Sequence, residues 1–273
     1  MKRLFFLFAM IAALHSTAQH QLQKIWETDT TLAVPESVLP DIPNKVLYVS
    51  LIDGAPWEAD GKGGIGKVDL NGKIINAKWI TGLHAPKGLG MFGNKLYVAD
   101  MNGVAIIDIA KGAIESTIKI DSAQGLNDIT VTDKGIVYVS DSRSKAGNIY
   151  RIENGNASLY LSGYPGVNGL RAVGNDLYVA TKEVYKVDAN KKRTAIGIID
   201  QGGDGIEPVG NGDWIGSAWA GYIYYIYADG KRDLLLDTHE QKWNTADIGY
   251  DPAKKIVYVP TFARKSVAAY QLK

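Results

Sequence analysis

Residues 124–142 read Gln-Gly-Leu-Asn-Asp-Ile-Thr-Val-Thr-Asp-Lys-Gly-Ile-Val-Tyr-Val-Ser-Asp-Ser, and this stretch holds the pattern that decides the fold. A polar residue, Asn127, precedes a short apolar run, and a turn follows at Asp133-Lys-Gly. A β-rich segment then ends in small and acidic residues. Alternating apolar residues bounded by turn residues predict strands and hairpins rather than helices.

The β-rich segment of this unit recurs six times along the chain. Its tyrosine, or a tryptophan in the same place, lies about 40 residues from the next copy, which is the period of a four-stranded propeller blade. One repeat is too small to bury its own apolar faces, so the repeats must stack on one another. The sequence therefore predicts an all-β, six-bladed β-propeller. The repeated aromatic residues are Tyr48, Tyr97, Tyr138, Tyr178, Trp214 and Tyr258.

The two ends of the chain predict how the ring closes. The last repeat is short by one strand, whereas residues 22–29 form a strand that belongs to no complete repeat. We expect the N-terminal strand to pair into the C-terminal blade, which removes open sheet edges. No linker divides the chain, so residues 19–273 are predicted to form a single domain. The predicted blades cover residues 35–82, 86–120, 126–161, 167–199, 204–236 and the remainder.

The first 18 residues have the pattern of a secretory signal peptide. Lys2 and Arg3 precede the apolar run 4–14, and small residues follow where a signal peptidase cleaves. The apolar run is too short to span a bilayer. We therefore predict a periplasmic or secreted protein without a membrane span. The absence of cysteine excludes disulfides, thiolate catalysis and Cys-ligated zinc.

The overall charge argues against a nucleic-acid partner. The chain has 30 Lys and Arg against 29 Asp and Glu, a formal net charge of +1. A near-neutral chain lacks the basic footprint that phosphate backbones require. We expect a monomer that acts on a small-molecule substrate.

The first blade carries a long insertion, residues 53–66, between its second and third strands. Loops of this length are often functional. Residues 61–68, Gly-Lys-Gly-Gly-Ile-Gly-Lys-Val, have the spacing of a phosphate-binding loop, but Val68 replaces the Ser or Thr that would hold magnesium. Such a loop should open a helix, whereas this stretch enters a hairpin turn at Asn71-Gly72. Nucleotide binding is therefore not expected.

The first strand of each blade should line the central channel, and its leading residues are polar. If the ring closes, these residues converge on one axis. Carboxylate and amide oxygens are the donors that Ca²⁺, Mg²⁺ and Mn²⁺ prefer. The set consists of Glu36, Lys87, Asn127, Asn168, Asp204 and, in the last blade, Asp247.

Two other interpretations of these residues stay open at this point. Polar residues at a channel mouth often simply contact water, although carboxylates crowded on one axis repel each other unless a cation or a base joins them. Lys87 is either the counter-charge of an ion-pair network without metal, or the binding partner of an anionic group on a ligand.

These motifs resemble the senescence marker protein (regucalcin) and gluconolactonase family of six-bladed propellers. The most specific pieces are Asn127-Asp128, Asn168-Gly169-Leu170 and Asp204-Gly205-Ile206. The resemblance implies that Glu36, Asn168 and Asp204 hold a divalent metal, Ca²⁺ first and Mg²⁺, Mn²⁺ or Zn²⁺ next, with Asn127 beside the metal or the substrate. The chain departs from the family pattern in two places. The glutamate lies in Glu36-Ser-Val-Leu-Pro40 instead of Glu-x-Pro-x-Trp, and the arginine of Arg-x-Asn-Asp falls on Gly125.

The resemblance further implies a metal-dependent hydrolase of a lactone or small ester. The metal would polarise the ester carbonyl and Asp204 would activate water, while Lys87 would steady the oxyanion or a substrate carboxylate. Among the tryptophans, Trp57, Trp219 and Trp243 are candidates for ligand contact, with Trp219 placed in the substrate site. The rival hypotheses are a non-catalytic propeller that binds a ligand or a partner protein, and a strictosidine-synthase-like enzyme.

Overall fold

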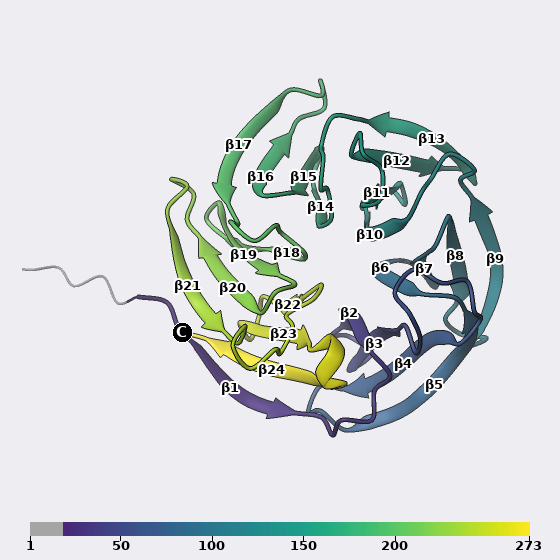
Figure 1. Cartoon of the computed structure of the whole chain (residues 1–273), viewed down its shortest axis with the longest axis horizontal. Helices are drawn as coiled ribbons and strands as arrows, with labels where there is room; N and C mark the ends of the chain where they lie inside the picture. The colour runs from purple at the N-terminus through teal and green to yellow at the C-terminus, as the bar shows by residue number, and fades with distance from the viewer. Residues whose placement is uncertain (1–18) are drawn as a thin grey trace, which may run out of the picture.

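The computed structural model describes residues 19–273, so the predicted signal peptide over residues 1–18 lies outside the described part of the chain. The strands form six four-stranded antiparallel sheets arranged in a ring around one axis (Figure 1). This confirms the predicted all-β, six-bladed propeller. Within the described residues, no helix has the length and apolar character needed to cross a membrane.

The blades follow one another in chain order, and their limits agree closely with the predicted ones. The first blade contains β2 (Pro35–Asp41), β3 (Val46–Leu51), β4 (Gly63–Asp69) and β5 (Ile74–Leu83). The second contains β6 (Pro86–Phe92), β7 (Lys95–Asp100), β8 (Gly103–Asp108) and β9 (Ala113–Lys119). The third contains β10 (Leu126–Val131), β11 (Val137–Asp141), β12 (Asn148–Glu153) and β13 (Asn156–Leu161). The fourth contains β14 (Leu170–Val173), β15 (Asp176–Ala180), β16 (Glu183–Val187) and β17 (Arg193–Ile198). The fifth contains β18 (Ile206–Gly210), β19 (Asp213–Ala218), β20 (Tyr222–Ile226) and β21 (Arg232–Asp237). The sixth contains β22 (Gly249–Asp251), β23 (Ile256–Pro260), β24 (Val267–Leu272) and β1 (Leu22–Glu27), with the short 3₁₀ helix η1 (Phe262–Arg264) between β23 and β24.

The ring closes through β1, as the sequence predicts. This strand pairs antiparallel with β24 and becomes the outermost strand of the sixth blade. Trp26 then donates a hydrogen bond of 3.1 Å from its indole N–H to the carbonyl of Leu70 in the first blade. Glu27 accepts hydrogen bonds from Arg264 at 2.6 Å and from Ser266 at 2.7 Å. The N-terminal strand therefore ties the last blade to the first.

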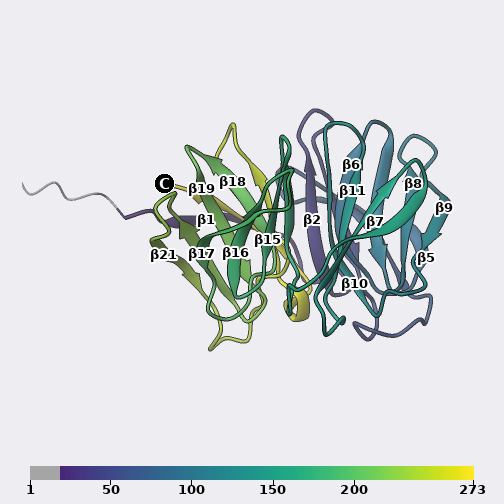
Figure 2. The ribbon, with the colours of Figure 1, turned by 90° about the horizontal axis from the view of Figure 1, so that it is seen from above.

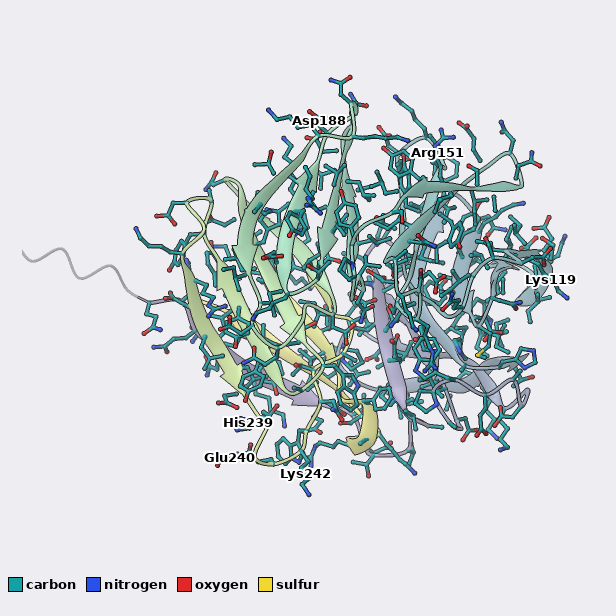
Figure 3. The ribbon with its side chains drawn as sticks, turned by 45° about the horizontal axis from the view of Figure 1, so that its top comes forward. Lys119, Arg151, Asp188, His239, Glu240 and Lys242 are labelled. Atoms are coloured by element: carbon teal, nitrogen blue, oxygen red, sulfur yellow. The ribbon has the colours of Figure 1, made fainter. Side chains whose placement is uncertain are left out.

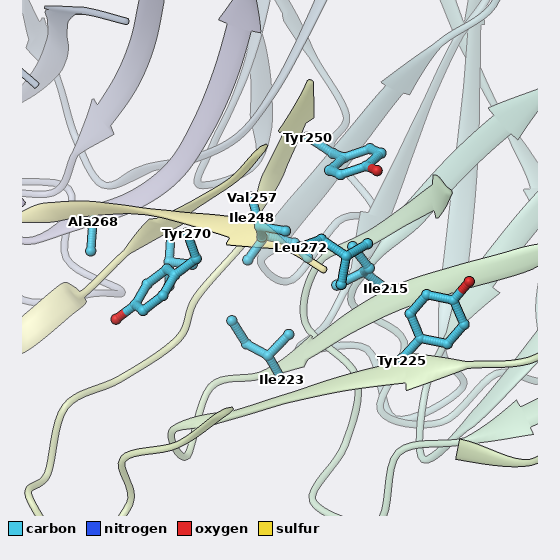
Figure 4. Close-up of a cluster of buried hydrophobic side chains, with 10 residues drawn as sticks. Ile215, Ile223, Tyr225, Ile248, Tyr250, Val257, Ala268, Tyr270 and Leu272 are labelled. Atoms are coloured by element: carbon cyan, nitrogen blue, oxygen red, sulfur yellow. The ribbon is translucent and has the colours of Figure 1, made fainter. Parts of the chain in front are cut away.

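A buried apolar cluster lies at each of the six boundaries between neighbouring blades. Figure 4 shows the cluster between the fifth and sixth blades, where Ile215 and Ile223 meet Ile248 and Val257. The alternation along each strand sends one set of side chains into such a boundary, and burial of these faces is the main driving force for stacking. Charged side chains such as Lys119, Arg151 and Asp188 lie instead toward the outer rim (Figure 3).

The starts of the inner strands share one face of the ring. Each start pairs with the end of the second strand of its blade, as in Pro35 opposite Leu51 and Leu126 opposite Asp141. The helix η1 follows the end of β23 and therefore marks this face, which we call the mouth face; it lies at the lower edge of Figure 2, in yellow.

The insertion on the mouth face is shorter than expected. Residues 63–66 belong to β4, with Gly66 opposite Val49, so the loop covers only residues 52–62. The glycines enter the strand because they lie against their neighbours too closely for a side chain: a Cβ on Gly64 would be 2.2 Å from the carbonyl oxygen of Ile80. The resemblance to a phosphate-binding loop thus ends in a strand and not in a helix.

Candidate metal and substrate site

In five of the six blades, the residue of the inner segment that lies at the mouth of the channel is polar. In the sixth blade it is not. The backbone N–H groups of Asn168, Asp204 and Ala246 make equivalent hydrogen bonds to the second strands of their blades, to the carbonyls of Ala180, Ser217 and Pro260. Ala246, and not Asp247, therefore occupies the position in the sixth blade that corresponds to Asn168 and Asp204. Asp247 lies one residue further along the inner segment, opposite Ser37, so it lies on the axis one step deeper than the mouth residues.

Glu36, at the start of β2, is buried, with 4% of its surface exposed. Burial and the nearby charge of Asp204 raise the pKa of its carboxyl well above the usual value, and the charge of Lys87 acts in the opposite direction. One of its oxygens, Oε2, is buried without a hydrogen-bond partner. Buried polar atoms are nearly always paired, so this oxygen needs an explanation.

Asn168 and Asp204 come from neighbouring blades and are joined directly. The amide Nδ2 of Asn168 donates to Oδ1 of Asp204 at 2.9 Å, which leaves the buried Oδ1 of Asn168 without a partner. The close approach depends on Gly169, because a Cβ there would lie 1.9 Å from the carbonyl oxygen of Asp204. Burial and the charge of Asp247 raise the pKa of Asp204, and the hydrogen bond from Asn168 opposes them.

The residues present fit a hard divalent cation. Glu36, Asn168 and Asp204 supply oxygen donors from three blades, and two of these buried oxygens have no protein partner. Two carboxylates match the charge of Ca²⁺, Mg²⁺ or Mn²⁺. Within residues 19–273 no three side chains of the His, Cys, Asp or Glu type gather as a metal-binding group, so such a site depends on the amide oxygen.

Lys87 is buried under the insertion of the first blade. Its ammonium donates to the carbonyls of Pro56 at 2.7 Å and Ala85 at 2.8 Å, and it lies 3.9 Å from the centre of the Trp57 ring. Burial lowers its pKa to about 8, against the opposing charges of Glu36 and Asp100. Over the described residues Lys87 makes no ion pair, so the ion-pair network proposed from the sequence is not formed.

The two other predicted substrate residues lie on the mouth face at different depths. Asn127 is buried at the start of β10, with 8% of its surface exposed. Trp219 follows β19, is 50% exposed, and packs edge-on against Phe262 at 5.4 Å. Trp243, also considered for ligand contact, has its ring covered by the Arg264 guanidinium at 3.8 Å.

A second layer of charged residues lies deeper in the channel; the sequence pointed to Asp128 and Asp247 but did not predict their depth, and sequence reasoning missed Arg171 and Glu207. Asp128 accepts hydrogen bonds from the N–H groups of Ile129 and Leu170, and Asp247 accepts one from Ser37. Burial raises the pKa of Asp247 to about 6. Alternate residues of a strand point to the same side, so the next residues of the inner strands to face the channel are Arg171 and Glu207. These two form an ion pair of 3.0 Å.

The space around this second layer is small. The cavity between Asp128, Asp247 and the Arg171–Glu207 pair measures about 20 Å³, room for about one water molecule. A larger hollow of about 510 Å³ lies at the hairpins of the third and fourth blades, among Asp133, Tyr160 and other outer residues. None of the predicted site residues line it.

Solved structures share this architecture. The fold is a six-bladed β-propeller of the kind also seen in gluconolactonase structures. A putative gluconolactonase superimposes with a TM-score of 0.69 at 13% identity, covering 94% of this chain and 93% of its own. A gluconolactonase from Xanthomonas campestris gives a TM-score of 0.61 at 13% identity, with 92% and 99% covered.

The same fold also occurs in a chain of a protein–protein complex. A chain of the nidogen/laminin complex superimposes with a TM-score of 0.64 at 15% identity, covering 77% of this chain and 82% of its own. No protein-family model matches the sequence, and no curated protein matches it. At these identities the likeness establishes the propeller fold, and the chemistry has to be argued from the residues.

Proposed function

We propose that the protein is an exported, divalent-metal-dependent hydrolase that opens a lactone or a related small ester. The observation that carries the proposal is the pair of buried oxygens without partners, Glu36 Oε2 and Asn168 Oδ1, beside Asp204 at the mouth of a gluconolactonase-like propeller. Export rests on the signal pattern of residues 1–18.

Glu36, Asn168 and Asp204 would hold the cation, with Ca²⁺ as the first candidate. When bound, a divalent ion supplies the Lewis acidity that polarises an ester carbonyl. Asp204 takes the proton of the attacking water, and the 2.9 Å hydrogen bond from Asn168 orients its carboxylate for this role.

The other predicted residues bind the substrate. Lys87 uses two of its three N–H donors on backbone carbonyls and keeps one for an oxyanion or a substrate carboxylate. Asn127, buried at the start of β10, would contribute an amide, and Trp219, exposed after β19, would offer an apolar surface. The expected substrate is a small molecule, and the expected state is a monomer.

The test combines calcium binding with turnover of a lactone and ester panel. We expect hydrolysis that a chelator abolishes and calcium restores, and Asp204→Ala should lose both calorimetric calcium binding and turnover. Asp41→Asn is the matched control, because Asp41 is equally buried but lies at the other end of β2. Turnover that survives both the chelator and Asp204→Ala would refute the proposal.

A second candidate, a non-catalytic propeller that binds a ligand or a partner protein, is favoured by the likeness to a chain of the nidogen/laminin complex. In that case Asp204→Ala leaves partner binding unchanged and no lactone or ester is hydrolysed. A strictosidine-synthase-like enzyme would instead be insensitive to the chelator.

A further inference from the structure

Three side chains from different blades form a cationic wall beside the candidate metal site. Trp57 lies in the loop between β3 and β4, Lys87 on β6, and Arg143 in the loop between β11 and β12. The Lys87 ammonium is 3.9 Å and the Arg143 guanidinium carbon 5.4 Å from the centre of the same Trp57 ring. Both distances are within the range of cation–π attraction. We call these three residues the cationic wall.

Lys87 gives the cationic wall a fixed position, because its side chain is buried and held by hydrogen bonds. Only 2% of its surface is exposed, and two backbone carbonyls hold its ammonium in place. Burying an ammonium is costly unless it is paired, yet no carboxylate lies within ion-pair distance of it in residues 19–273. A third N–H remains for a ligand.

Arg143 is the described arginine whose guanidinium makes no hydrogen bond or ion pair within residues 19–273. The others all donate to a carboxylate or a carbonyl; these are Arg151, Arg171, Arg193, Arg232 and Arg264. Arg143 is exposed and packs over the indole instead of seeking a carboxylate. Its planar fork of N–H donors is therefore available, and this fork matches carboxylate and phosphate oxygens.

Gly125 makes room for this arrangement. A Cβ at this position would lie 2.5 Å from Cγ of Arg143 and 2.7 Å from Cζ3 of Trp57. The glycine lies two residues before Asn127, so the side chains of Arg143 and Trp57 occupy the space above the start of β10. Because Gly125 has no side chain, the side chain of Arg143, from the next loop of the same blade, occupies this space.

We infer that Arg143, together with Lys87, binds an anionic group of the substrate, so that the natural substrate is an acidic lactone that carries a carboxylate or a phosphate. This inference rests on the proposed function. The cationic wall borders the carboxylates, because Lys87 lies within electrostatic reach of Glu36 and Trp57 belongs to the same blade as Glu36. A substrate whose ester lies at the oxygen donors and whose anionic group reaches Lys87 and Arg143 matches both features.

Hydrolysis of three lactones tests the inference: neutral gluconolactone, glucarolactone with its carboxylate, and phosphogluconolactone. Arg143→Met should raise KM about tenfold for the charged lactone that the protein prefers and leave KM for gluconolactone unchanged. Lys145→Met is the matched control, because it removes the same charge from the same exposed loop. Gly125→Ala should act like Arg143→Met without any change of charge, since the new Cβ displaces the arginine.

Calorimetric titration with glucarate separates the failure of this inference from that of the proposed function. If no lactone is hydrolysed but glucarate binds, and binds about tenfold more weakly to Arg143→Met, the anion site stands and the hydrolase proposal falls. If the lactones are hydrolysed but Arg143→Met and Lys145→Met leave equal preferences for charged and neutral lactones, the anion site is refuted. A phosphate preference over carboxylate, lost in Arg143→Met, would confirm the site and identify its anion.

Discussion

Glu207→Gln is expected to make the protein more stable at alkaline pH and to leave it nearly unchanged at acidic pH. Glu207 is buried on β18, and its carboxylate accepts from the guanidinium of Arg171 at 3.0 Å. Burial raises the pKa of Glu207 from 4.5 to about 7, although the charge of Arg171 lowers it. The ion pair fails to compensate for burial because 37% of the Arg171 side chain is in water, where its field is screened.

The direction in which the free energy of unfolding changes with pH follows from which state, folded or unfolded, holds the proton on Glu207. Between the unfolded pKa of 4.5 and the folded pKa of about 7, the folded protein holds a proton on Glu207 that the unfolded chain has released. The free energy of unfolding therefore falls as pH rises through this window. Since one pKa unit corresponds to about 1.4 kcal/mol, the ionised carboxyl costs the folded state about 3 kcal/mol above the window, as an upper value. Glutamine keeps an acceptor for Arg171 and cannot ionise.

Urea unfolding followed by tryptophan fluorescence, in buffer with a chelator, measures the effect. The free energy of unfolding of Glu207→Gln relative to the wild type should rise by up to about 3 kcal/mol between about pH 5 and about pH 8. Glu153→Gln is the control, because Glu153 also pairs with an arginine, Arg151, but on the exposed surface at 2.7 Å. A difference for Glu207→Gln that is as flat with pH as that of the control would refute the reasoning.

Two further predictions concern the contact between blades and the closing strand. Gly169→Ala should lower the free energy of unfolding by about 1–3 kcal/mol and weaken calcium binding, because its Cβ would lie 1.9 Å from the carbonyl oxygen of Asp204 and push Asn168 away; unchanged calcium affinity in calorimetry would contradict this. Glu27→Gln should cost about 1.5–3 kcal/mol near neutral pH, because burial disfavours the Glu27 charge but hydrogen bonds from Arg264, Lys24 and Ser266 outweigh it and lower its pKa to about 2. That stability is present above the ordinary pKa of 4.5 and is lost as pH falls toward 2, so chemical denaturation at a series of acidic pH values should show the two proteins converging.

The ring and its order could be predicted from the sequence, because the information is local and repeated. Strand alternation and turn pairs specify each blade, and the about 40-residue period specifies how many there are. The spare strand predicted at residues 22–29 and the missing strand of the last repeat predicted the closure that the pairing of β1 with β24 confirms. Glu36, Asn168 and Asp204 could be placed at the mouth for the same reason, since equivalent positions of a repeat lie on the same ring. Their role as metal ligands stays a prediction.

Contacts between blades could not be predicted in this way. Asp247 lies one residue deeper than expected because Ala246 takes the equivalent backbone position. Lys87 is held by the carbonyls of Pro56 and Ala85, and not by a carboxylate. The position of Glu207 on the axis, two residues after Gly205, follows from strand alternation, but its contact with Arg171 of the neighbouring blade does not.

The sequence by itself thus determined the propeller, its closing strand and the identity of the residues that reach the mouth of the channel. The tertiary structure decided which of them touch: Asn168 with Asp204, Lys87 with Trp57, and Arg143 across the bare backbone of Gly125. The reason is physical. A strand pattern depends on the alternation of neighbouring residues, whereas a contact on the axis depends on how closely two blades approach and on where a loop from a third one folds, and these distances are set by packing over the whole ring.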